Sequence, residues 1–274
     1  MVQISVIVPA YNAEEYLAST LRSIFAQTFP PLEVILVNDG STDDTENIAL
    51  QMGVKKIVTH PRNMGIGAAR QSATSFVKGS FIAYLSSDDV YHPKFLEKSS
   101  AFLAHDTATF TDYYTCNETL MPTSVFKAPA FETQEEFRNL CMEWALKKNM
   151  FVNFSSIIVP QNVFGMVRFE EKLRHGEDLI FLLDTIIMGL KWTHIASPLL
   201  YYRLHGMQGT VKARRNAEEF NALWLCLKDR LTRLGMEKAK VDLSYWESFS
   251  HAYPDPLERC RRKMGTALRL IGKR

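Results

Sequence analysis

The sequence predicts an α/β fold, in which a mostly parallel sheet is flanked by helices, followed by a helical C-terminal region. Over residues 1–105, short apolar and β-branched runs alternate with segments of helical apolar spacing. The connections between these segments are short, so helical crossovers join consecutive strands into a parallel, doubly wound sheet. In such a sheet, ligands bind beyond the carboxyl ends of the strands.

Each element of this pattern has a local reason. The expected strands are buried-type runs at residues 4–8, 34–37, 55–59 and 81–85. Helices are expected where apolar residues recur at helical spacing, at residues 14–27, 45–52 and 65–77, and in a segment that begins near Pro93 and ends at Leu103. After Thr107 the pattern loosens. There we expect helices at residues 131–148 and 177–188 and strand-like segments at residues 154–159, 192–195 and 199–203.

The composition describes an ordinary globular protein. Apolar residues make up 46% of the 274 residues, charged residues make up 23%, and the net charge is +2, which excludes a nucleic-acid binder as the overall class. The wide spacing of the cysteines fits neither a zinc site nor a redox pair. The first strand begins where a signal peptide would lie, and no apolar run approaches the roughly 18 residues of a membrane helix. We therefore expect a cytoplasmic protein.

The loop after the second strand contains Asp39-Gly40-Ser41. A carboxylate at this edge of the sheet can accept the N–H of a pyrimidine base, and Gly40 permits a turn with positive φ. An ordinary turn explains the same residues, and taken alone it is the better explanation.

The loop after the fourth strand ends in Asp88-Asp89. Two adjacent carboxylates repel each other unless a cation or strong donors offset their charge. Mg²⁺ or Mn²⁺ bound to a diphosphate is such a partner, because these ions take one or two carboxylates and fill their other sites with phosphate and water oxygens. The alternative is acidic capping of the following helix.

Three further segments carry candidate residues. Arg70, on the third helix, either faces a diphosphate or is a solvated surface arginine. Glu177-Asp178 precedes an apolar helix, and the pair either provides a general base or caps the helix. His205 follows the last clear strand, and it is either a metal ligand or a structural histidine.

Taken together, these loops resemble the family 2 glycosyltransferases, which share the GT-A fold. The matching segments are SVIVPAYN, VNDGSTD, the stretch from NMG to AR, LSSDD and GED, at residues 5–12, 37–43, 63–70, 85–89 and 176–178. They occur in the family's order over roughly residues 3 to 205. Each segment is weak alone, whereas the ordered set is specific.

The resemblance implies a role for each candidate. Pro9, Ala10 and Tyr11 would line the base pocket, Asp39 would contact uracil or thymine, and Arg70 and Asp88 would lie near the nucleotide. Asp88 and Asp89 match the metal motif, with Asp89 as the direct ligand, and His205 lies in a Tyr-Arg-x-His stretch that helps to hold metal or diphosphate. Asp178 would be the general base, with Glu177 beside it. Ser86 stands where many members have an acid, which leaves the ribose contact open.

The implied activity is transfer of a hexosyl group from a UDP- or dTDP-sugar to a hydroxyl of a glycan or lipid-linked acceptor. A divalent metal would neutralise the leaving diphosphate, and Asp178 would deprotonate the acceptor as it attacks, so the anomeric configuration would invert. We expect a glycosyltransferase domain over residues 1–212, with a nucleotide half (1–105) and an acceptor half (106–212). In the acceptor half, Met150, Phe151, Phe154, Trp192 and Tyr201 are more often core than sugar-stacking residues.

Residues 213–274 form an expected helical extension with a basic tail. After Glu258 the chain has seven Lys and Arg residues and no acid, so the tail either lies on an anionic membrane surface or is a solvated terminus. Two other functions compete with the main one. A nucleotidyltransferase is disfavoured because residues 9–12 lack the Gly-rich basic loop, and a non-catalytic nucleotide-sugar-binding or scaffold protein is disfavoured because both acid pairs are intact.

Overall fold

The computed structural model describes residues 2–146, 150–206 and 217–236. The chain divides into two compact units, Met1–His205 and Gly206–Arg274. This boundary falls slightly before the expected one at residue 212. One sheet runs through the first unit, so the expected nucleotide and acceptor halves share it.

The first four strands form the predicted parallel sheet. They are β1 (Ile4–Ala10), β2 (Glu33–Asn38), β3 (Lys56–Thr59) and β4 (Phe81–Tyr84), and they pair in the order β3-β2-β1-β4. Their crossovers are α1 (Leu17–Phe25), α2 (Thr45–Gln51) and α3 (Ile66–Thr74). Because the four strands are parallel, their carboxyl ends lie at one edge, as expected.

The second half extends the sheet with mixed pairing. β8 (Ile157–Pro160) lies antiparallel between β4 and β6 (Thr107–Cys116). β6 runs parallel to β9 (Lys191–Arg203), which pairs with the short β5 (Val90–Tyr91). A hairpin adds β7 (Pro122–Phe126) to the end of β6. The sheet is therefore mostly parallel in its first half and mixed in its second.

The second half differs in part from the expectations. Strand β6 was not expected, because its threonines and central Asp112 hide the apolar pattern of a strand buried for much of its length. Residues 154–156 form a 3-10 turn, η1 (Phe154–Ser156), before β8 begins. The two expected strands at residues 192–195 and 199–203 are one strand, β9, because Pro198 lies at a register shift, where a missing N–H is tolerated.

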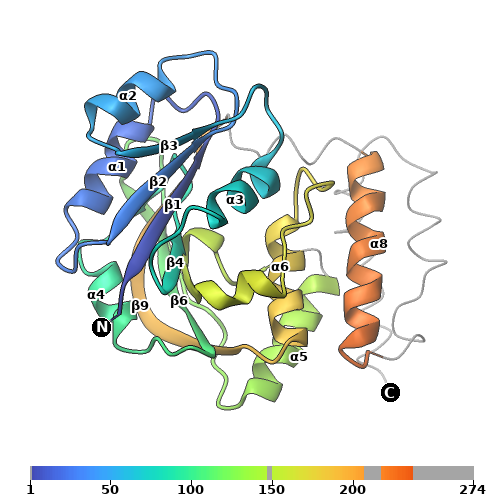
Figure 1. Cartoon of the computed structure of the whole chain (residues 1–274). Helices are drawn as coiled ribbons and strands as arrows, with labels where there is room; N and C mark the ends of the chain where they lie inside the picture. Colours follow the sequence, from blue (N-terminus) through green and yellow to red (C-terminus); the bar gives the residue numbers. More distant parts are fainter. Residues whose placement is uncertain (1, 147–149, 207–216, 237–274) are drawn as a thin grey trace. The chain divides into compact units, whose positions relative to one another are not determined.

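Helices cover both faces of the sheet. Figure 1 shows α1 and α2 on one side and α3 and α6 (Glu177–Ile187) on the other. Alternate residues of β1, among them Val6 and Val8, belong to one buried cluster with Leu17 and Leu21 of α1 and Phe95 of α4 (Phe95–Ser100). Helix α5 (Gln134–Leu146) and the short turn η2 (Gln161–Gly165) complete this unit. The core therefore lies between the sheet and its helices and leaves the carboxyl edge of the strands to the loops.

The second unit contributes one described helix, α8 (Ala217–Arg233). Its apolar side chains Trp224, Leu227 and Leu231 are buried. The basic tail after Glu258 lies outside the described residues. None of the described helices is long and apolar enough to cross a membrane.

Candidate active site

The loops after β1 and β2 are tied together at the carboxyl edge of the sheet. Pro9 and Ala10 are buried at the end of β1, whereas Tyr11 is 48% exposed. Asn12, at φ 49°, accepts a hydrogen bond from the Thr42 amide and donates its own amide to Ser41 Oγ (2.9 and 3.0 Å). Such backbone conformations are uncommon outside glycine and favour asparagine. Tyr11 is thus the exposed member of the predicted base-pocket residues.

Asp39 anchors the segment at residues 60–65. Its Oδ1 accepts from His60 Nδ1 at 2.7 Å and from the Met64 amide at 2.9 Å, and its Oδ2 accepts from the Gly65 amide at 2.9 Å. Gly40, at φ +73°, makes this approach possible: a Cβ there would lie 2.4 Å from the main-chain carbon of Arg62. Asp39-Gly40 is therefore a turn and also the attachment point of the next loop.

The two acids after β4 have opposite environments. The Asp88 side chain is 25% exposed, and its Oδ2 lies 2.9 Å from His205 Nε2. Asp89 is 1% exposed; its Oδ2 accepts from Ser155 Oγ at 2.7 Å and its Oδ1 from the Arg203 amide at 3.1 Å. Burial, and then the charge of Asp88, raises the pKa of Asp89 well above its ordinary value. Asp89 as the direct metal ligand does not agree with this geometry, because its carboxylate is turned into the interior; Asp88 is the accessible acid.

Arg203, to which no site role was assigned from the sequence, holds the acid loop in place. Its Nε donates to the Asp88 carbonyl at 2.8 Å, its Nη2 to Ser19 Oγ at 3.0 Å and its Nη1 to the Glu118 carbonyl. The guanidinium carbon lies 4.4 Å from the ring centroid of Tyr16. The sequence signal was a cation at the end of a buried strand, which has to be paired.

Asp88 and His205 suit a cation that takes few protein ligands. No group of three His, Cys, Asp or Glu residues that could hold a metal occurs in the described part of the chain. A carboxylate and an imidazole nevertheless face each other, and His205 Nδ1 is buried with no hydrogen-bond partner among the described residues. Mg²⁺ and Mn²⁺ at nucleotide sites take one or two side chains and otherwise phosphate and water oxygens. The donor set therefore fits such an ion.

Arg70 and Glu177 form a buried ion pair. Arg70 Nη1 lies 2.5 Å from Glu177 Oε1, and their side chains are only 5% and 4% exposed. The Arg70 guanidinium lies over the ring of Phe154, 4.2 Å from its centroid. Burial, and then the charge of Asp178, raises the pKa of Glu177 to about 7. Arg70 is thus neither surface-exposed nor free of partners, and its predicted contact with the nucleotide stays a prediction.

Asp178 is the accessible acid of the second pair. It is half-buried in the first turn of α6, where its Oδ1 accepts from the Leu179 amide at 2.8 Å. Gly176 precedes the helix at φ 80°. Arg174 Nη1 donates to Asn63 Oδ1 at 2.7 Å, so the loop before α6 contacts the loop before α3. Together with the Arg70–Glu177 pair, this contact places the start of α6 beside the start of α3.

The aromatic residues considered for the acceptor side belong mainly to the core. Phe151, Phe154 and Trp192 are buried, and half-buried Tyr201 stacks on Tyr114 with centroids 5.1 Å apart. This agrees with the more common structural interpretation of such residues. Met150 is partly exposed.

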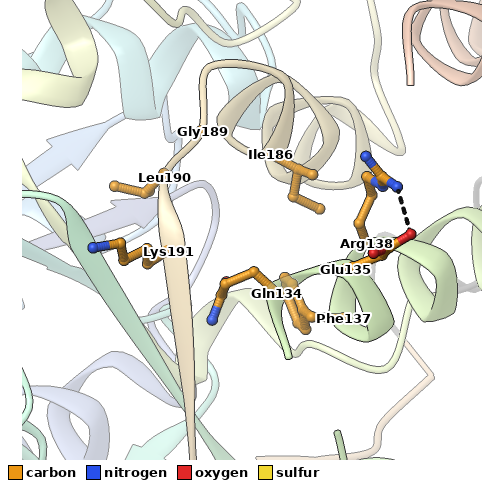
Figure 2. A pocket seen from close by; sticks show the side chains of 8 residues that line it. All are labelled: Gln134, Glu135, Phe137, Arg138, Ile186, Gly189, Leu190 and Lys191. Atoms are coloured by element: carbon orange, nitrogen blue, oxygen red, sulfur yellow. Dashed lines mark hydrogen bonds and ion pairs between the residues drawn. The ribbon is translucent and has the colours of Figure 1, made fainter. Parts of the chain in front are cut away.

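A hollow of about 280 Å³ lies away from these residues, between α5 and the connection from α6 to β9 (Figure 2). The Gln134 amide bonds both the N–H and the carbonyl of Trp192, and Arg138 reaches Glu135 at 3.5 Å. Lys191 begins β9, whereas Arg203 ends it, so the hollow lies at the opposite edge of the sheet from the predicted site.

Similarity to known proteins agrees with this geometry. The structure resembles S. aureus TarS in complex with UDP-GlcNAc (TM-score 0.71, 23% identity, 87% of this chain and 69% of that one). It also resembles glucosyl-3-phosphoglycerate synthase from Mycobacterium tuberculosis in complex with Mn²⁺, UDP and glucosyl-3-phosphoglycerate (TM-score 0.57, 19% identity, 86% and 81%). The fold is therefore the GT-A fold of glycosyltransferases.

The sequence gives the family. The model of glycosyl transferase family 2 matches residues 5–144. An uncharacterized glycosyltransferase of Rickettsia prowazekii is 28% identical over 84% of this chain and 73% of its own length. The putative teichuronic acid biosynthesis glycosyltransferase TuaG of Bacillus subtilis is 30% identical over 73% and 79%. The chain belongs to glycosyltransferase family 2, as its motifs predicted.

Proposed function

We propose that this glycosyltransferase transfers a sugar from a UDP- or dTDP-linked donor to a hydroxyl of a glycan or glycolipid acceptor, with inversion at the anomeric carbon. The observation that carries the proposal is the Asp88–His205 pair, 2.9 Å apart where β4 and β9 end. A second accessible acid, Asp178, begins α6.

The nucleotide lies across the carboxyl edge of the parallel strands. Tyr11, with Pro9 and Ala10 beneath it, lines the base pocket, and the Asp39 carboxylate accepts from the base. Structures of TarS with UDP-GlcNAc and of glucosyl-3-phosphoglycerate synthase with UDP support a uridine nucleotide.

Asp88 and His205 would hold a divalent ion, Mn²⁺ or Mg²⁺, and Asp89 supports the loop. Arg203 fixes the Asp88 main chain and so orients the carboxylate. When bound, the ion neutralises negative charge on the leaving diphosphate. The Mn²⁺ in the synthase complex supports this assignment.

Asp178 accepts the proton of the attacking hydroxyl. Attack from the face opposite the departing nucleotide inverts the anomeric configuration. Glu177 is a positioning residue, because its buried carboxylate is paired with Arg70 and has no access to an acceptor. The relative TuaG, named for teichuronic acid biosynthesis, supports a polysaccharide acceptor.

Thermal unfolding with UDP, dTDP, GDP, ADP and CMP, each with Mn²⁺ or with EDTA, tests the proposal. A ligand that binds only the native state raises the unfolding midpoint. We expect a rise with UDP or dTDP that EDTA removes. No rise with any nucleotide would make a non-catalytic role the better hypothesis, and a product with retained configuration would disprove inversion.

The basic tail and the cytoplasmic location are further parts of this proposal. Co-sedimentation with anionic liposomes, comparing the full chain with a version that ends at Asp255, tests membrane contact of the tail. We expect only the full chain to pellet; equal, negligible pelleting of both would refute the contact.

A further inference from the structure

Three polar side chains form a hydrogen-bonded chain from the end of β2 to α3. His60 Nδ1 lies 2.7 Å from Asp39 Oδ1, and His60 Nε2 lies 3.0 Å from Ser72 Oγ. Asp39 and His60 are 3% and 8% exposed. His60 was not singled out in the sequence, since a lone histidine after a short strand carries no signal of its own.

The hydrogen bonds leave Asp39 one acceptor site. An ionised carboxylate offers about four lone-pair sites, two on each oxygen. On Oδ1 both are used, by His60 Nδ1 and the Met64 amide. Oδ2 accepts only from the Gly65 amide among the described residues. A ligand donor therefore has a single place to bind this carboxylate, on Oδ2.

The proton of His60 can be assigned from its partners. An ionised carboxylate only accepts hydrogen bonds, so Nδ1 carries the proton. In the neutral ring, Nε2 is then an acceptor, and the single proton of the Ser72 hydroxyl is shared between Nε2 and the Ala69 carbonyl, which lies 3.1 Å from Ser72 Oγ. Ser72 fixes one side of the ring and Asp39 the other, so the imidazole holds Oδ1 in one orientation.

We infer that His60 is a positioning residue for nucleotide selection: it keeps Oδ1 of Asp39 occupied and directs Oδ2 to accept the imide N–H of a uracil or thymine base. The inference rests on the proposed function, because it concerns the same nucleotide site. Uracil and thymine carry a proton on the ring nitrogen N3, whereas cytosine has a lone pair there. A fixed anionic acceptor therefore favours UDP over CDP.

Two nearly isosteric substitutions separate this role from simple support of the loop. His60→Asn keeps a donor near the position of Nδ1, whereas His60→Leu has a similar volume and no donor. His105→Ala is the matched control, because the His105 side chain is exposed and, among the described residues, the hydrogen bond of His105 is made by its main-chain carbonyl, which accepts from Asn162. Calorimetric titration with UDP and with CDP, both with Mn²⁺, gives the ratio of the two affinities.

We expect His60→Leu to lower the UDP/CDP affinity ratio about 10-fold, the size of one hydrogen bond to a charged group. His60→Asn and His105→Ala should keep the ratio within about 3-fold of the wild type. An equal loss of both affinities in His60→Leu, or no change in the ratio, would overturn the inference.

A substitute variant and the behaviour of the wild type show whether the proposed function or only the role of His60 has failed. If His60→Leu does not fold, Ser72→Ala takes its place, with a ratio lowered about 3-fold expected from the freed imidazole and an unchanged ratio counting against the inference. If the wild type binds neither nucleotide, the proposed function fails; if it prefers UDP and the variants keep that preference, only the role of His60 fails.

Discussion

In each of the two acid pairs of this enzyme one carboxylate is buried and the other is accessible, although the order of the two along the chain is reversed. After β4, the first acid, Asp88, is accessible and the second, Asp89, is buried; at the start of α6, the first acid, Glu177, is buried and the second, Asp178, is accessible. In each pair the buried carboxylate is tied to a distant segment: Asp89 to Ser155 and the Arg203 amide, and Glu177 to Arg70. One acid of each pair thus holds its loop, and the other is accessible.

The two buried acids differ in their partners. Glu177 Oε1 lies 2.5 Å from Nη1 of Arg70, whose guanidinium packs on the ring of Phe154. Asp89 accepts from a hydroxyl and an amide. Loss of a partner should therefore cost more at α6, because a buried charge without a counter-charge is worse than a lost neutral hydrogen bond.

The largest expected effect separates Asp178 from Glu177. Asp178→Asn should lower kcat about 10²- to 10⁴-fold, the range for loss of a general base, with nucleotide affinity unchanged. Glu177→Gln, which can still accept from Arg70, should lower kcat far less. Donor turnover and UDP binding, measured on both variants, test this; equal losses of kcat would contradict the division of roles.

Removal of Arg70 should give the largest loss of stability. Arg70→Met leaves Glu177 buried without a counter-charge and should lower the free energy of unfolding by about 3–5 kcal/mol. The double variant Arg70→Met/Glu177→Leu should regain much of this loss. Urea unfolding of the two variants checks the pair, and a double variant no more stable than Arg70→Met would show that the ion pair is not the source.

The β4 loop offers a matched pair of alanine substitutions. Asp88→Ala should remove most of the Mn²⁺-dependent part of UDP binding and leave stability nearly unchanged, because this carboxylate is accessible. Asp89→Ala removes two buried hydrogen bonds and should cost about 1–3 kcal/mol of stability. UDP titrations with Mn²⁺ and with EDTA, together with urea unfolding, should give opposite patterns; Mn²⁺ dependence lost only in Asp89→Ala would reverse the assignment.

The remaining expected effect is a pH dependence that belongs to Glu177. Its pKa is raised from 4.5 to about 7, so between these values the native state binds more protons than the unfolded state. Its contribution to stability is then fully present below pH 4.5 and is lost as pH rises to about 7, by at most about 1.4 kcal/mol per pH unit. Glu177→Gln should flatten this part of the profile; an unchanged slope would assign it to another group.

The sequence predicted the elements whose signal is local. The strands β1 to β4, their crossover helices and the carboxyl-edge loops follow from apolar periodicity and turn residues, and the ordered motifs gave the family. The strand β6 was missed because it is interrupted by polar residues, one of which, Asp112, has its partner, His194, 82 residues away. The different environments of Asp88 and Asp89 could not be predicted for a similar reason: adjacent acids look alike in sequence, and their partners come from distant segments.

The mismatch in length between β6 and β9 has a consequence for how this chain tolerates insertions. Thirteen residues of β9 run beside ten of β6, and the surplus is taken up around Pro198. Side chains alternate between the two faces of a strand, so the parity of that surplus decides which residues after Pro198 point to which face. Loss of a single residue there would exchange the facing of Tyr202 with that of Tyr201 and Arg203 while leaving their identity intact. The number of residues in this strand therefore matters independently of which residues they are. A change of two residues at once would preserve the facing of the side chains that follow.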